Sequence, residues 1–148
     1  MNGRAGQAWK TWLEDVELTG IDIFGCFAFP EKYSPQNAER IVRCFWKEEI
    51  SKFFSKDIKV LQVADRQPAL DRIHYHFVGK DLTEKNRSDK SKQDLARIVS
   101  WKWKTGEKSL LRGTCRIDAY DETQGGIPYM FNRHEEWEEL IFTRNDRK

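Results

Sequence analysis

The chain has few of the residues that hold small secreted or zinc-binding domains together. Its 148 residues include three cysteines, three histidines and four prolines. Cys26, Cys44 and Cys115 stand far apart and form no Cys-x-x-Cys pair, which argues against a disulfide framework or a zinc knuckle. Each cysteine lies in an apolar context, so we expect buried free thiols in a reducing compartment.

Long apolar runs are also missing. No segment approaches the roughly 18 apolar residues that a membrane-spanning helix needs, and residues 1–7 lack the apolar region of a signal peptide. No Gly-rich phosphate-binding loop of the Walker type occurs. These absences predict a soluble cytoplasmic protein, with no membrane partner and no helicase motor of its own.

The charged residues are abundant but nearly balanced. They make up 34% of the chain, yet the net charge is only +2, and 39% of the residues are hydrophobic. This composition predicts one folded domain with a heavily charged surface rather than a uniformly basic protein. The basic excess lies in residues 80–112, which hold ten Lys or Arg against five Asp or Glu. Because Trp101 and Trp103 stand within this segment, it moderately favours nucleic-acid binding over a merely solvated face.

Apolar periodicity predicts alternating helices and strands in a single domain over residues 1–148. Helices are expected over residues 8–18 (within an N-terminal helical segment, 1–19), 35–55, 94–103 and from 127 towards 142, and strands over 21–29, 57–65, 72–78 and 112–120. The tail, 143–148, is expected to fray. The short loop 67–71 predicts that strands 57–65 and 72–78 pair as an antiparallel hairpin. The fold class is therefore α+β, a central antiparallel sheet with helices packed mainly on one face.

Two of the three histidines stand in one short strand. His74 and His76 alternate with Ile73, Tyr75 and Phe77, so the imidazoles share one face of the sheet and the apolar side chains share the other. A metal site is the leading hypothesis, and solvated strand histidines are the alternative. The third, His134, has no second histidine in a His-Glu-x-x-His motif, so His134 and its neighbouring glutamates are interpreted as a solvated acidic helix face.

With these features in order, the chain resembles the rolling-circle replication initiators (Rep proteins) of the HUH endonuclease superfamily. Two features of this resemblance are specific to the family: the His74-Tyr75-His76 strand and the helix expected around Tyr129. The remaining similarity is in the order of the helices and strands. The resemblance implies a ferredoxin- or RRM-like HUH nuclease fold, in which two histidines and an acid bind one divalent ion, Mn²⁺ or Mg²⁺. By position, the third ligand is Asp65, and Asp71 is a weaker candidate.

The resemblance also implies a tyrosine nucleophile. Tyr129 takes that position, but Asn132 stands where the family has lysine, three residues on. A phenol with a pKa of about 10 needs activation before it attacks. Asn132 can orient a phosphate or a water but carries no charge, which Arg133 could supply. Tyr120 is the rival nucleophile, although its position at a strand end also suits packing.

The implied function is a single-stranded DNA nicking and joining endonuclease that initiates rolling-circle replication through a 5′-phosphotyrosine intermediate. Its partners would be the origin strand of a plasmid or phage and the helicase and polymerase of the host, in the host cytoplasm. The candidate strand contacts are Lys80, Lys102, Lys104 and Arg116. A relative that binds DNA without cutting it and a single-tyrosine transposase, which needs a dimer, remain the alternatives.

Overall fold

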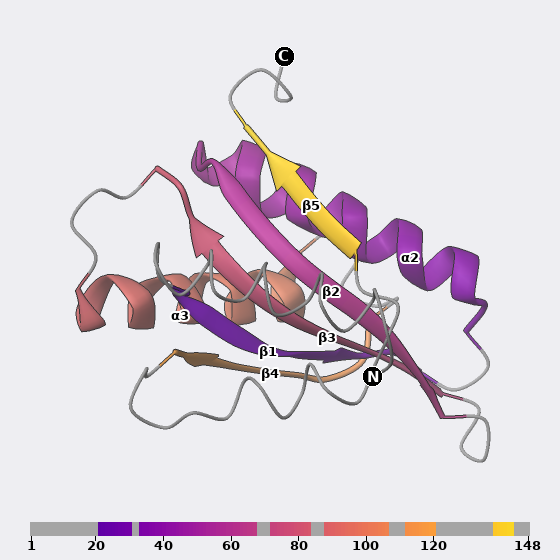
Figure 1. Ribbon diagram of the computed structural model, residues 1–148. Helices are drawn as coiled ribbons and strands as arrows, with labels where there is room; N and C mark the ends of the chain where they lie inside the picture. The colour runs from indigo at the N-terminus through magenta and orange to yellow at the C-terminus, as the bar shows by residue number, and fades with distance from the viewer. Residues whose placement is uncertain are drawn as a thin grey trace, which may run out of the picture.

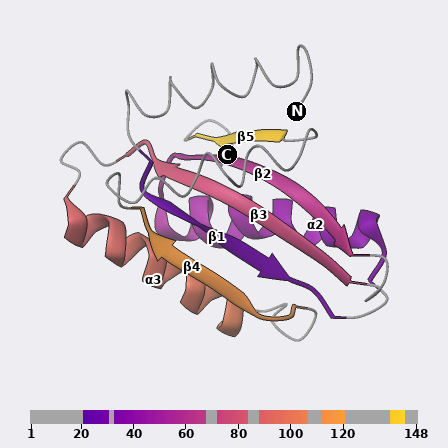
Figure 2. The ribbon, with the colours of Figure 1, turned by 60° about the horizontal axis from the view of Figure 1, so that its bottom comes forward.

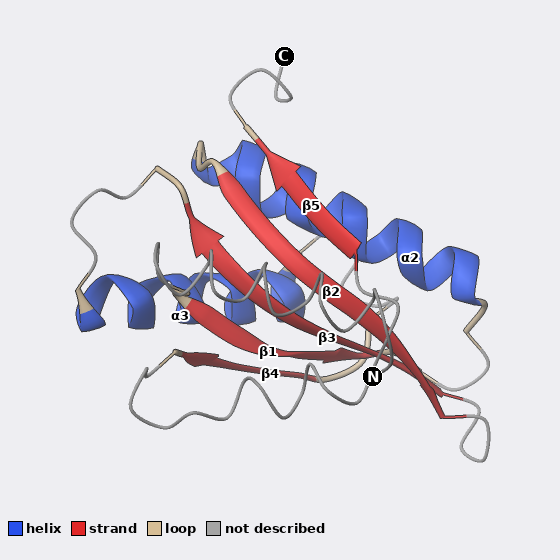
Figure 3. Cartoon of the chain, viewed as in Figure 1, coloured by secondary structure: helices blue, strands red, loops and turns tan. Residues whose placement is uncertain are grey.

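The described part of the chain is a five-stranded sheet with helices on one face. The computed structural model describes residues 21–30, 33–67, 72–83, 88–106, 112–120 and 138–143. Figure 1 and Figure 3 show the arrangement of these elements. They are β1 (Ile23–Ala28), α2 (Pro35–Cys44), the π-helix η1 (Phe45–Lys52), β2 (Ile58–Gln67), β3 (Arg72–Asp81), α3 (Asp89–Thr105), β4 (Cys115–Ala119) and β5 (Glu138–Phe142).

The strand order places the histidine strand in the middle of the sheet. The order is β4-β1-β3-β2-β5, and every neighbouring pair is antiparallel. Both edge strands, β4 and β5, have five residues. Figure 2 shows that α2 and α3 lie on the same side of the sheet. The α+β class, the antiparallel sheet and the β2–β3 hairpin are therefore confirmed.

The first helix begins as the sequence predicts but changes its pitch. Ser34 Oγ accepts a hydrogen bond from the Asn37 backbone N–H, and proline follows Ser34 at the first helical position. The expectation of one 3.6-residue period over 35–55 is wrong from Phe45 onward, where the chain is a π-helix. Its wider turn lets Phe45, Trp46 and Ile50 all point into the core.

Helix α3 is longer than the sequence predicts. It begins at Asp89 instead of 94, because Ser88 and Ser91 form a reciprocal capping box: each hydroxyl accepts a hydrogen bond from the other residue's backbone N–H. It ends at Thr105, two residues later than expected, with Gly106 as its C-cap. The apolar face of α3 packs Leu95, Val99 and Trp103 against the sheet.

The last described element corrects the sequence prediction. Residues 138–142 form strand β5 along β2 and not the end of a helix. Glu138 accepts hydrogen bonds from Arg43 and from Gln62 Nε2, the latter at 2.7 Å. Glu138 therefore joins the sheet to α2 and is not part of a solvated acidic helix face. The helix expected over 8–18, the rest of the one expected from 127, His134 and the residues after Thr143 lie outside the described part of the chain.

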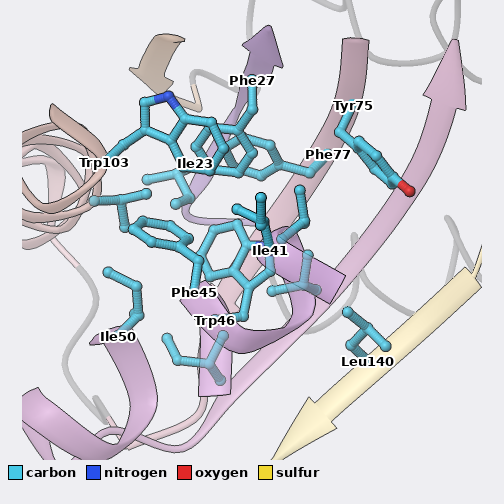
Figure 4. Close-up of a cluster of buried hydrophobic side chains, with 14 of the residues drawn as sticks. Ile23, Phe27, Ile41, Phe45, Trp46, Ile50, Tyr75, Phe77, Trp103 and Leu140 are labelled. Atoms are coloured by element: carbon cyan, nitrogen blue, oxygen red, sulfur yellow. The ribbon is translucent and has the colours of Figure 1, made fainter. Parts of the chain in front are cut away.

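Aromatic side chains fill the core between the sheet and the helices. The Phe27 ring of β1 stacks on Trp103 of α3, with ring centroids 4.1 Å apart, and on Phe77 of β3 at 4.8 Å. Phe45 and Trp46 meet the same ring at 5.3 and 5.7 Å. Figure 4 shows this cluster. Phe27 thus connects β1 and β3 with η1 and α3.

A pair of phenylalanine substitutions measures how much the fold depends on this contact. Phe27 is 0% exposed and Phe53 is 63% exposed. Phe27→Ala should lower the free energy of unfolding by about 3–5 kcal/mol, because it removes a ring that four others contact. Phe53→Ala should cost less than about 1 kcal/mol. Denaturant unfolding followed by circular dichroism measures both, and equal losses would contradict the central role of Phe27.

Candidate functional site

The side chains of strand β3 alternate between the core and the opposite face of the sheet. Ile73, Tyr75 and Phe77 are buried in the cluster that packs on the helices. His74 and His76 alternate with them and are only partly buried. The predicted alternation is therefore confirmed, and the two imidazoles share the sheet face that α2 and α3 leave uncovered. We call this the histidine face.

The β2–β3 hairpin brings Asp65 to the same face. In the register, Asp65 lies opposite His74, and Val63 lies opposite His76. Directly opposed residues in an antiparallel pair project to the same side of the sheet. Asp65 Oδ2 lies 3.5 Å from His76 Nε2, and both side chains are 23% exposed. This contact is an ion pair when the imidazole is protonated.

Strand β1 supplies the other neighbours of the histidines. Ala28 lies opposite His74, and Cys26 lies opposite His76. A thiol therefore stands on the histidine face, which the sequence did not reveal, because the run 21–29 is almost continuously apolar and shows no alternation. All three cysteines are free and half-buried, where full burial was expected. Burial raises the pKa of the Cys26 thiol, and a hydrogen bond with the Arg116 backbone opposes that rise.

His74, His76 and Asp65 are residue types that bind divalent ions, and the strand register places them on one face of the sheet. Two imidazoles and one carboxylate suit Mn²⁺, or Mg²⁺ when water and phosphate complete the shell. In the part of the chain that the structure describes, no three His, Cys, Asp or Glu side chains converge closely enough to form a metal cluster. Asp65 and His76 are in contact, while His74 is placed by its register opposite Asp65.

Of the two candidate tyrosine nucleophiles, the structure describes Tyr120 and not Tyr129. Tyr129 and its neighbours Asn132 and Arg133 lie outside the described residues, as does Asp71. Tyr120 follows β4 and is buried, with its ring edge-on to Phe24 at 6.2 Å. Its backbone N–H donates to the Asp22 carbonyl at 2.9 Å. These contacts favour packing as the role of Tyr120.

The four predicted strand contacts fall into two groups. Lys80 lies on β3 an even number of residues from His76, so its side chain is on the histidine face. Arg116 lies opposite Cys26 and is on the same face. The Arg116 side chain is 86% exposed and is 3.7 Å from Asp118. Lys102 and Lys104 lie on α3, in the layer on the other side of the sheet. A single flat surface does not carry all four.

Comparisons with protein-family models, with curated proteins and with solved structures find no match for the chain. Among the described helices, none is both long enough and apolar enough to cross a membrane.

The environment of Cys26 predicts a shifted pH dependence of its reactivity. In a Cys44→Ser, Cys115→Ser chain with chelator present, the rate of Cys26 alkylation should keep rising above pH about 8.5, where an ordinary thiol is half ionised. The same thiol unfolded in urea is the matched control and should level off earlier. The pKa of Cys26 is higher in the folded protein than in the unfolded chain. Its contribution to the free energy of unfolding is therefore fully present at neutral pH, and it decreases as the pH rises past the pKa of the unfolded chain. Identical profiles would contradict the burial effect.

Proposed function

We propose that the protein is a metal-dependent endonuclease that nicks and rejoins single-stranded DNA to start rolling-circle replication of a plasmid or phage. The observation that carries this proposal is the grouping of two imidazoles and a carboxylate on the histidine face, with His76 Nε2 3.5 Å from Asp65 Oδ2. The resemblance of the His74-Tyr75-His76 strand to the HUH endonucleases supports the same chemistry.

His74, His76 and Asp65 would hold one Mn²⁺ or Mg²⁺. When bound, the ion supplies a Lewis acid that polarises the scissile phosphate and offsets charge on the leaving oxygen. The protein's own part is to fix the donors. The strand ladder sets the spacing of the histidines, and the Asp65 carboxylate beside Nε2 holds the His76 ring on this face.

Tyr129 is the proposed nucleophile. Its phenol loses a proton to a base or solvent, and its oxygen bonds to phosphorus while the bond from phosphorus to the 3′ oxygen breaks. The 3′ oxygen leaves as a hydroxyl, and the 5′ end remains on the protein as a phosphotyrosine. The phosphodiester is conserved, so the reverse attack by a 3′ hydroxyl rejoins the strand. Asn132 orients the phosphate and Arg133 supplies positive charge.

The substrate strand would lie across the histidine face. Lys80 and Arg116 share that face with the metal-binding residues, so they can bind phosphates on either side of the cleavage point. Helicase and polymerase activities would come from the host, in whose cytoplasm the protein would act.

A second candidate, a relative that binds DNA without cutting it, has one observation in its favour. The three proposed metal-binding side chains do not converge as a cluster in the described structure. Asn132 in the position of the family lysine points the same way, because an amide lacks the positive charge with which lysine stabilises a phenolate.

Metal binding is tested by titrating Mn²⁺ and following the free-ion signal by electron paramagnetic resonance. The protein should bind one ion, and His74→Ala, His76→Ala or Asp65→Asn should each weaken binding on the order of 10-fold or more. Asp118→Asn, a carboxylate on the same sheet face, is the matched control and should leave the affinity unchanged. Absence of saturable binding, or equal affinity in all variants, would contradict the metal site.

Cleavage is tested with labelled single-stranded origin DNA and Mn²⁺ on a denaturing gel. A covalent protein–DNA adduct should form, and chelator or Tyr129→Phe should abolish it. Tyr33→Phe, at a half-buried ring against Phe29, is the control and should retain the adduct. An adduct that survives Tyr129→Phe but not Tyr120→Phe would move the nucleophile to Tyr120. Tight binding without any adduct would favour the non-cleaving relative.

A further inference from the structure

A groove runs between helix α3 and the edge strand β4, away from the histidines. Its volume is about 490 Å³, and it is lined on one side by Arg97, Ser100, Trp101 and Lys104 of α3 and on the other by Ile117 and Asp118 of β4. In the described sheet, β4 pairs with β1 alone, so its outer edge borders this groove.

Trp101 gives the groove an aromatic surface. Its side chain is 54% exposed, whereas Trp46 and Trp103 are fully buried in the core. An indole left open in a groove offers a flat face on which an unpaired base can stack. Lys102 Nζ lies 5.4 Å from the Trp101 ring centroid and 3.6 Å from that of Phe53. These cation–π contacts hold the indole in place on the helix surface.

Two exposed cations flank this indole. Arg97 lies about one helical turn before Trp101 and Lys104 about one turn after it, so their positions are roughly 10 Å apart along the helix axis. Arg97 makes a loose exposed contact with Asp94 at 3.7 Å, which is worth little in water. Across the groove, Asp118 is 3.7 Å from Arg116. The charge exposed around Trp101 is therefore positive.

Strand β4 connects the groove to the histidine face. Arg116 points to the histidine face, while the next residue, Ile117, lines the groove. A strand bound at Arg116 therefore needs to cross only the width of this edge strand to reach Trp101.

We propose that the α3–β4 groove binds single-stranded DNA that flanks the nicking site, with a base stacked on Trp101 and phosphates bound by Arg97 and Lys104. This inference rests on the proposed function, which identifies the bound strand as the DNA that is nicked.

A second groove, between α2 and β5, has a similar volume of about 550 Å³ and is lined by Arg40, Arg43 and Lys47. Its one aromatic lining residue, Phe142, is half-buried, and its Arg43 is engaged by Glu39 and Glu138. It therefore supplies matched controls.

The test measures the affinity of the full chain for a fluorescein-labelled oligothymidylate by polarisation at several salt concentrations. Trp101→Ala should weaken binding roughly 5- to 100-fold, the effect of losing one base–aromatic stack. Trp101→Phe should recover most of it. Lys104→Ala should lower the slope of log affinity against log salt by about 0.7, the value for one phosphate contact on a single strand. Lys47→Ala, the same charge change in the other groove, should leave the slope unchanged.

Two further readouts keep the outcomes separate. Circular dichroism checks that each variant is folded, and cross-linking to iodouracil DNA followed by peptide mapping should identify Trp101. If the Tyr129 adduct never forms but Trp101→Ala still weakens binding, the nuclease proposal fails and the groove stands. If the adduct forms while Trp101→Ala and Lys104→Ala change neither affinity nor slope, the groove proposal is overturned. Binding of an acidic peptide but not DNA would likewise overturn it.

Discussion

The register between β2 and β3 is the constraint on which the candidate site depends. The two strands pair without interruption from Ile58 opposite Asp81 to Gln67 opposite Arg72. Because side chains alternate, a slip of one residue would move Asp65 to the helix-covered face and leave His74 without a carboxylate opposite. The core prevents such a slip. A slip of β2 would move Ile58 and Val60 out of the core and bury the Asp65 carboxylate in it. The histidine face therefore takes its geometry from the apolar face behind it.

The helix layer fixes the other side of this arrangement. The Arg112 side chain is buried, pairs with Glu49 of η1 and donates to the carbonyls of Lys102 and Trp103 at 3.1 and 3.3 Å. Removing one partner would leave a buried charge uncompensated, which costs far more than a surface ion pair contributes. The pair joins the π-helix, the end of α3 and the approach to β4. The described helices are thus tied together on the face of the sheet opposite the histidines.

The sequence predicts best what depends on neighbouring residues. The histidine alternation, the Ser34-Pro35 helix start and the β2–β3 pairing are local patterns, and the structure confirms them. It predicts poorly what depends on distant contacts. Leu140 and Ile141 suit a helix as well as a strand, and only pairing with β2 makes 138–142 a strand. The face of Asp65 and the position of Cys26 follow from register, which no single strand encodes. The proposed role of Tyr129 stays a prediction.

The division of the basic residues follows from the same topology. Residues 80–112 are rich in Lys and Arg, but this segment leaves the sheet after β3 and returns through α3 on the opposite side. Lys80 therefore belongs to the histidine face and Lys104 to the helix layer. Because the net charge is only +2, the proposed DNA binding would depend on local basic surfaces and not on the charge of the whole molecule. The short edge strand β4 lies between them. Its exposed Arg116 and Asp118 discourage pairing with another sheet edge, and in the proposed complex the DNA strand would cross β4 from one surface to the other.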